Sequence, residues 1–137
     1  MNFNYPKKEK LCSKSIIDKL FSEQKPIYEH PLKVFWIIHP LPEKVPVQSA
    51  VAVSKRNFKR ANKRNLLKRR MREAFRLNKQ VLYSKIESLD IQIAVMIIFN
   101  HTKILSFNEI EPAMQKVFSK IITRIEAQGP NRGEGEK

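Results

Sequence analysis

The sequence contains little cysteine and glycine, and it has no long apolar run. The single cysteine, Cys12, excludes an internal disulfide and a zinc site built from several cysteines. All three glycines lie beyond Gln128, and no apolar stretch reaches the roughly 18 residues that a membrane helix needs. No apolar signal-peptide core follows the N-terminus. These absences favour an intracellular protein without a membrane span.

Aspartate and histidine are also scarce. The two aspartates, Asp18 and Asp90, lie in different segments, and His30, His39 and His101 do not have the spacing of metal ligands. Metal-dependent nucleases hold their cations with clustered carboxylates. The sequence therefore disfavours a self-sufficient metal-dependent active site, although a fold could still gather distant groups.

Positive charge is what the chain has in excess. Its 137 residues include 27 Lys and Arg against 13 Asp and Glu, which gives a net charge of +14. With 42% hydrophobic residues it can build a core, and its length suits one domain. The charge balance indicates an anionic partner, either nucleic acid or an acidic surface.

Hydrophobic patterning predicts one α/β domain over residues 11–127. Residues 1–10 are expected to form a basic flexible arm, and residues 128–137 a disordered tail. The expected elements are a helix that starts near Ser13 and stops before Pro26, strands over residues 32–39, 48–54 and 91–99, a basic helix, and a helix over residues 106–127.

The last of these helices has two competing start signals. Ser106 and Glu109 fit a capping box, which places the start at Ser106. Pro112 is tolerated only in a first turn, which would move the start of the regular helix to near Glu111.

The basic segment between Lys55 and Lys79 carries twelve cationic side chains and a single acidic one, Glu73. At the helical period, one side of it is apolar and the other cationic. The apolar side comprises Leu67, Met71, Ala74 and Phe75, and the cationic side comprises Asn65, Lys68, Arg69, Arg72, Arg76 and Lys79. A helix with a packed face and a cationic face is expected, rather than a featureless basic tail.

The N-terminus of this helix, near Asn62, is surrounded by cations, although helix starts favour acidic residues. An external phosphate would explain the arrangement, because free N–H groups at a helix start bind phosphate. The alternative is a solvated face that keeps the protein soluble, but such faces usually mix both signs. Asn65, inside the cationic side, could contact a sugar, a base edge or a phosphate.

The strands offer a second candidate surface. Lys33, Phe35 and Ile37 share one face of their strand, and the strand over residues 48–54 has a face of small side chains, Ala50 and Ala52. Aromatic rings on the first helix and the strands could stack on unpaired bases, although most are expected in the core. These rings are Phe21, Phe35, Trp36 and Phe99.

The motifs of the chain resemble those of the protein subunit of bacterial ribonuclease P, in its Bacteroidetes-like branch. Val53-Ser54-Lys55-Arg56 resembles the family's strand-end Val-Ser-Lys-Lys. Arg64-Asn65, followed by Lys68-Arg69, Arg72 and Ala74-Phe75, resembles the family's Arg-Asn-Arg helix. Leu11 with Ile17, Leu20 and Phe21 resembles its N-terminal helix. The resemblance covers roughly residues 8–126.

The chain also departs from the family pattern. Leu66 stands where the motif has its third residue, an arginine, so that role is absent or falls to a neighbour such as Arg70. Ile17 aligns with a family aromatic, which weakens the case for stacking there. The stretch from Asn78 to Leu89 is longer than the family's usual connection.

The resemblance implies an α/β, two-layer fold of the ribosomal-S5-domain-2-like type, in the order α-β-β-α-β-α, with a left-handed basic crossover helix. It also implies a role in removing the 5′ leader of precursor tRNA in the cytoplasm. The large RNA subunit is the catalyst and uses Mg²⁺, for which no protein site is defined, so the protein contributes no catalytic residue. One monomeric protein would bind each RNA.

Two sets of site residues follow from the resemblance together with the charge pattern. The leader-binding candidates are Phe21, Lys33 and Phe35. The candidates for binding the RNA subunit are Lys55, Arg56, Lys59, Arg60, Arg64, Asn65, Lys68, Arg69, Arg72 and Arg76. The competing interpretations are a ribosomal protein, a stand-alone nuclease and a DNA-binding helix.

Overall fold

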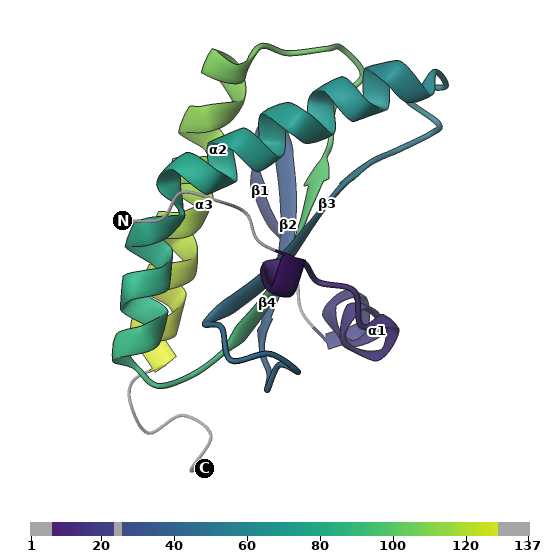
Figure 1. The fold of residues 1–137 in the computed structure, drawn as a ribbon. Helices are drawn as coiled ribbons and strands as arrows, with labels where there is room; N and C mark the ends of the chain where they lie inside the picture. Colours follow the sequence, from purple (N-terminus) through teal and green to yellow (C-terminus); the bar gives the residue numbers. More distant parts are fainter. Residues whose placement is uncertain (1–6, 24–25, 129–137) are drawn as a thin grey trace.

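The structure is a computed structural model that describes residues 7–23 and 26–128. Three α-helices and one short 3₁₀ helix accompany a single four-stranded sheet in the described residues (Figure 1). The elements are η1 (Lys7–Glu9), α1 (Lys14–Glu23), β1 (Ile27–Glu29), β2 (Leu32–Ile38), β3 (Val47–Val53), α2 (Ala61–Ser88), β4 (Ile93–Phe99) and α3 (Phe107–Gln128). The mixed α/β class predicted from the sequence is confirmed.

The sheet has the strand order β1-β2-β4-β3, so β3 forms one of its edges. β2 pairs with β1 and β4 in antiparallel fashion, whereas β3 and β4 are parallel and α2 connects them. β4 is apolar along its length because it is a central strand with packed side chains on both faces.

The larger core lies on the sheet face covered by α2 and α3. Val34, Trp36, Val95 and Phe99 point to this side, and the predicted apolar stripes of both helices pack on them. Trp36 and Phe99 are 3% and 1% exposed, so these two rings belong to the core and are not available for stacking.

The opposite sheet face carries α1 and a smaller core. Leu20 of α1 packs with Phe35, Ile37 and Met96, while Ala50 and Ala52 of β3 are only partly buried. Ser13 caps α1, since its hydroxyl accepts a hydrogen bond from the Ile16 N–H at 3.4 Å.

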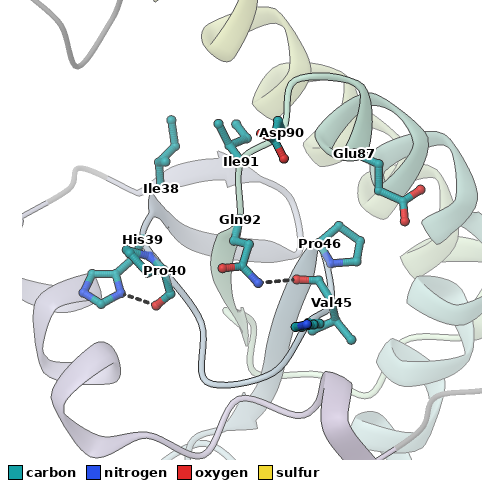
Figure 2. A pocket seen from close by; sticks show the side chains of 10 residues that line it. Ile38, His39, Pro40, Val45, Pro46, Glu87, Asp90, Ile91 and Gln92 are labelled. Carbon is teal, nitrogen blue, oxygen red and sulfur yellow. Dashed lines mark hydrogen bonds between the residues drawn. The ribbon is translucent and has the colours of Figure 1, made fainter.

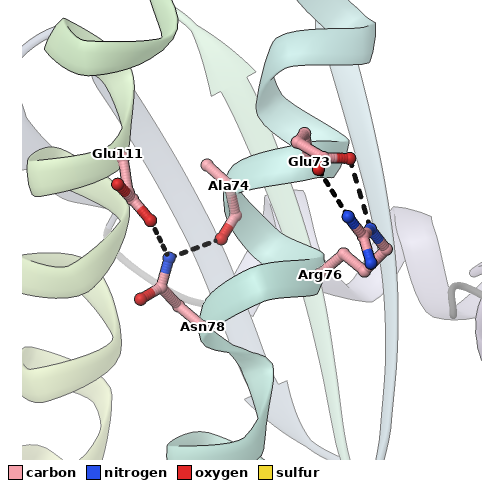
Figure 3. Close-up of polar contacts among 5 residues, drawn as sticks. All are labelled: Glu73, Ala74, Arg76, Asn78 and Glu111. Carbon is pink, nitrogen blue, oxygen red and sulfur yellow. Dashed lines mark hydrogen bonds and ion pairs between the residues drawn. The ribbon is translucent and has the colours of Figure 1, made fainter. Parts of the chain in front are cut away.

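α2 is longer than the predicted basic helix and changes direction about midway (Figure 1). The stretch from Asn78, described above as a long connection, continues the helix to Ser88 and buries Leu82 and Ile86 against the core. Asn78 Nδ2 donates to the carbonyl oxygen of Ala74 at 2.8 Å and to Glu111 Oε2 of α3 at 2.9 Å (Figure 3). A side chain that takes an i−4 carbonyl bends a helix, so Asn78 provides a physical cause for the bend.

α3 begins at Phe107, not near Glu111. The capping box decides the start, because Glu109 Oε1 accepts hydrogen bonds from the Ser106 N–H at 2.9 Å and the Ser106 hydroxyl at 3.1 Å. These bonds hold the pKa of Glu109 below its usual range. Pro112 is accommodated inside the helix.

One element was missed, and one further expectation is wrong. β1 was not predicted; three residues of β-strand are too short for a clear alternation pattern. The flexible arm is wrong for Lys7–Lys10, which form η1 and a parallel bridge from Lys10 to Ser49 of β3. Residues 1–6 of that arm and residues 129–137 of the expected tail lie outside the described residues.

Candidate nucleic-acid interface

The loop between β3 and α2, residues 54–60, displays four cations at one end of the sheet. Phe58 is 7% exposed and its ring lies 5.9 Å from that of Phe99, which fastens the loop to the core. Asn57 Nδ2 donates to the carbonyl oxygen of His101 at 3.3 Å. With the loop held at these two points, its cationic side chains are all exposed: Lys55, Arg56, Lys59 and Arg60.

The N-terminus of α2 follows this loop and has no side-chain cap. Arg60 occupies the N-cap position with extended backbone and makes no capping hydrogen bond through its side chain. A helix start without a cap leaves N–H donors at the positive end of the macrodipole. Surrounded by cations, these donors suit a phosphate, as the sequence predicts.

Most of the predicted cationic face of α2 lies at the surface. Asn65, Arg69 and Arg72 are exposed, and Lys68 is half-buried. Leu67, Met71, Ala74 and Phe75 are at most 1% exposed on the opposite side. The predicted helix phase is therefore confirmed for this stretch.

Two arginines of α2 hold parts of the fold. Arg64 Nη1 donates to the carbonyl oxygens of Phe58 and Lys59 at 2.8 and 2.9 Å, which closes the loop over the start of α2. Arg70 Nη1 donates to the carbonyl oxygen of Leu105 at 2.6 Å. Arg70 is thus engaged within the fold and is a poor substitute for the motif arginine that Leu66 replaces.

Arg76 forms an ion pair along α2 (Figure 3). Its Nη2 and Nε lie 2.5 and 3.2 Å from the two carboxylate oxygens of Glu73. The hydrogen bond to Glu73 raises the pKa of Arg76. Because Glu73 offsets its charge, Arg76 adds less net positive charge to this face than the exposed Arg69 and Arg72.

Lys79 is wrongly placed on the cationic face by the helical period. It is 3% exposed, and its Nζ lies 2.9 Å from Glu9 Oε1. The bend of α2 and the docking of η1 enclose this side chain, and neither feature can be read from helical periodicity.

The three leader-binding candidates gather on the sheet face that carries α1. The rings of Phe21 and Phe35 meet edge to face at 4.8 Å between centroids, and Lys33 Nζ lies 5.5 Å from the Phe35 centroid. Phe21 is 46% exposed but Phe35 only 8%. Phe35 therefore supports the ring of Phe21 and has little stacking surface of its own.

Tyr28 completes this ring cluster and was missed with β1. It is 60% exposed, and Lys33 Nζ lies 5.7 Å from its ring centroid. Tyr28 pairs with Lys33, Lys33 with Ile98, and Ile98 with Ala52, so one cross-strand row runs from the ring cluster to β3. At the β3 end of this row, Ala50 and Ala52 present only small, partly buried side chains.

A further hollow lies at the other end of the sheet. It has a volume of about 570 Å³ and lies where β2 ends and β4 begins, at the loop after Ile38 (Figure 2). Gln92 fixes the position of this loop, since its Nε2 donates to the carbonyl oxygens of Glu43 and Val45 at 2.9 and 2.8 Å. Lys44, Glu87 and Asp90 give the hollow a mixed charge, which suits a polyanion poorly.

Neither a metal cluster nor a membrane helix is found among residues 7–23 and 26–128. No group of three or more His, Cys, Asp or Glu side chains there could hold a metal ion. No helix there is both long and apolar enough to cross a membrane.

Comparison with known proteins connects the chain to one family. The sequence model of the Ribonuclease P family matches residues 5–122. The Ribonuclease P protein components of two Porphyromonas gingivalis strains are each 32% identical over 123 residues, which is 90% of this chain and 90% of theirs.

The fold is shared with solved structures as well. A structure of the Staphylococcus aureus RNase P protein matches with a TM-score of 0.65 and 16% identity, covering 82% of this chain and 94% of that one. A mutant of the S. aureus protein with defective mRNA degradation activity matches with a TM-score of 0.61 and 16% identity, covering 82% and 87%. The chain belongs to the family of ribonuclease P protein components.

Proposed function

We propose that this chain is the RNA-binding accessory subunit of ribonuclease P and that it binds two RNAs on two surfaces. The cationic loop and α2 bind the catalytic RNA, and the ring cluster on the α1 face binds the single-stranded 5′ leader of precursor tRNA. One observation carries the first assignment: the start of α2 is uncapped and ringed by cations that the fold displays outward. Family membership supports RNA as the anion at this surface.

The contacts to the catalytic RNA divide into direct and supporting ones. The exposed side chains bind phosphates directly; they are Lys55, Arg56, Lys59, Arg60, Asn65, Arg69 and Arg72. Lys68 and Arg76 are half-buried and lie at the margin of this surface. Arg64 acts by holding the loop in place through its two carbonyl hydrogen bonds.

The leader contacts combine stacking with charge. Phe21 and Tyr28 are exposed rings, Tyr28 against Lys33 and Phe21 against Phe35, and base–aromatic stacking contributes about 1–3 kcal/mol per base. Lys33 supplies a cation for the backbone, and Phe35 orients Phe21 from beneath. This surface distinguishes precursor tRNA, which carries a leader, from mature tRNA.

The complete enzyme contains further components that the protein does not supply. One protein monomer binds each RNA subunit, and the RNA subunit carries out cleavage with Mg²⁺ that the RNA positions. The assembly acts in the cytoplasm, where precursor tRNA is processed. A ribosomal protein of similar charge would instead co-sediment stoichiometrically with ribosomal subunits.

Charge reversal separates RNA binding from folding. Arg69→Glu with Arg72→Glu should weaken binding of the RNA subunit at least tenfold in a filter-binding titration. Lys116→Glu with Arg124→Glu, on exposed positions of α3, makes the same charge change and should have a much smaller effect. Equal losses in the two double variants would show that net charge alone drives binding and would refute the assigned surface.

A further inference from the structure

The segment from Lys7 to Ser13 carries three lysines into a groove beside α2. It packs along the edge strand β3, where the Leu11 N–H donates to the carbonyl oxygen of Ser49 at 2.9 Å and Lys10 bridges to Ser49. Gln48 Nε2 donates to the carbonyl oxygen of Lys8 at 2.8 Å. These bonds give the segment a fixed register, and Lys7, Lys8 and Lys10 are exposed on it.

A buried ion pair fastens this segment to α2. Glu9, which is 9% exposed, lies with its Oε1 2.9 Å from Lys79 Nζ and accepts a hydrogen bond from the Tyr83 hydroxyl at 2.6 Å. Lys79 Nζ also lies 5.1 Å from the Tyr83 ring centroid. Burying two charges carries a desolvation cost that their attraction often only offsets, so such a pair is better explained by the position it fixes than by stability.

Two adjoining hollows connect the lysines to the RNA-binding surfaces. The first, of about 350 Å³, is lined by Lys7, Lys8, Lys10 and Ser13, with Glu43 as its one carboxylate. The second, of about 180 Å³, is lined by Lys10, Ala50 and Arg72 among others. Lys10 and Cys12 line both hollows. The two together, here called the lysine groove, run from Arg72 on α2 to the start of α1.

The lining of the lysine groove indicates which part of a nucleic acid it fits. No Phe, Tyr, Trp or His lines either hollow among the described residues, so bases find no ring to stack on. Flexible ammonium groups bind phosphate as point charges without reading sequence. Ala50 places one end of the groove on the sheet face that carries the ring cluster. A single-stranded nucleic acid that stacks on Phe21 and crosses the small side chains of β3 arrives at Lys10.

We propose that the lysine groove binds the phosphate backbone of the distal part of the 5′ leader, and that the buried Glu9–Lys79–Tyr83 contact is the positioning device that holds it in place. This inference rests on the proposed leader-binding function and extends the leader's path beyond the ring cluster. Phosphates of the catalytic RNA are the alternative occupant, and the experiment separates the two.

The test uses the assembled RNA–protein complex and precursor tRNAs whose leaders are lengthened one nucleotide at a time. With the wild-type protein, the affinity of the complex for precursor tRNA should rise in two stages as the leader lengthens. The first rise comes when the leader reaches the ring cluster, and the second comes when it reaches the lysines. The Lys7→Gln, Lys8→Gln, Lys10→Gln variant should lose only the second rise, about three- to tenfold. Lys116→Gln, Lys120→Gln, Arg124→Gln on α3 is the control with an equal charge change and should keep both rises.

Glu9 and Lys79 are tested in the same titration. Glu9→Gln leaves Lys79 buried without its carboxylate and should release the segment, so that the second rise is lost although all three lysines remain. Adding Lys79→Met to Glu9→Gln removes the unpaired buried charge and should recover thermal stability, but the second rise should stay lost because the contact that positions the segment is gone. Return of the second rise together with stability would show that the pair serves stability alone and would overturn its positioning role.

Each of the other outcomes of this titration contradicts one part of the proposal. Loss of affinity at every leader length, or weaker assembly with the RNA subunit, would place the lysines on the catalytic RNA and overturn the leader assignment. Retention of the second rise in the triple variant would overturn the groove altogether. If the wild-type protein shows no dependence on leader length at all, the proposed leader-binding function itself fails.

Discussion

At the residue scale, neighbouring positions of α2 differ sharply in exposure to solvent. Arg69 and Arg72 are exposed, whereas Met71 between them is fully buried. Charge reversal at the two arginines should therefore leave the fold intact, while Met71→Asp buries an unpaired carboxylate and should unfold the protein. Thermal melts followed by circular dichroism check this. A native melt for Met71→Asp together with unfolded arginine variants would show that the helix phase is wrong.

The two rings of the cluster should respond differently to truncation. Phe35 is almost buried, so Phe35→Ala should lower the free energy of unfolding by about 3–5 kcal/mol and harm every activity alike. Phe21 is nearly half exposed, so Phe21→Ala should cost clearly less stability but weaken binding of precursor tRNA, with mature tRNA unaffected. Urea denaturation measures the stability of both variants, and titrations with precursor and mature tRNA measure their affinities. Equal losses of stability in Phe35→Ala and Phe21→Ala would contradict the assigned burial.

Single residues also show what a sequence alone conceals. The period of α2 places Arg69 and Arg72 correctly, because their exposure depends on the helix alone. It misplaces Lys79, because the burial of that side chain depends on Glu9, 70 positions earlier in the chain. Phe35 shares its strand face with Lys33 as predicted, but only the docking of α1 reveals that Phe21 covers it.

Helix capping governs a prediction at the element scale. The hydrogen bonds from Ser106 lower the pKa of Glu109, so the folded state favours the ionised carboxylate. Its contribution to stability is present above the unfolded-state pKa and is lost as the pH falls through the lowered folded-state pKa. Glu109→Gln should therefore lower the melting temperature at neutral pH, and the difference from wild type should shrink in acid.

Glu87→Gln, at an exposed position near the end of α2, is the matched control and should leave the melting temperature nearly unchanged. A constant difference between wild type and Glu109→Gln across the acidic range would show that the carboxylate charge does not stabilise the cap.

The elements were predicted with uneven success for physical reasons. Strands with long apolar runs, such as β2 and β4, lie within one or two residues of their expected bounds. β1 was missed because its pairing with β2, not its own pattern, makes it a strand. The second half of α2 was described as a connection, since polar residues interrupt its apolar stripe and only α3 reveals the face it buries.

At the scale of the whole molecule, the cations act together on the RNA. If about six of them neutralise phosphates of the RNA subunit, the logarithm of the association constant should fall with the logarithm of salt concentration with a slope between roughly −4 and −5. Titrations at several salt concentrations measure this slope. A slope near zero would mean that the cationic surface makes few phosphate contacts.

The overall charge and the basic helix predicted an anionic partner, and the family resemblance implied that this partner is RNA. They were not sufficient to place the two RNA surfaces relative to each other, because that depends on how α1 and the Lys7–Ser13 segment cover the sheet. The sequence alone predicts a flexible arm for the lysines of that segment, because Glu9 and Lys79 meet only in the folded chain.

Cleavage of a precursor tRNA by reconstituted components tests the central claim most directly, namely that the protein binds RNA while its RNA partner performs catalysis. The purified protein alone should be inactive with Mg²⁺. Together with the RNA subunit it should restore cleavage at the mature 5′ end at a Mg²⁺ concentration too low for the RNA alone. Cleavage at that position by the protein alone, in a preparation pretreated with nuclease, would contradict the account.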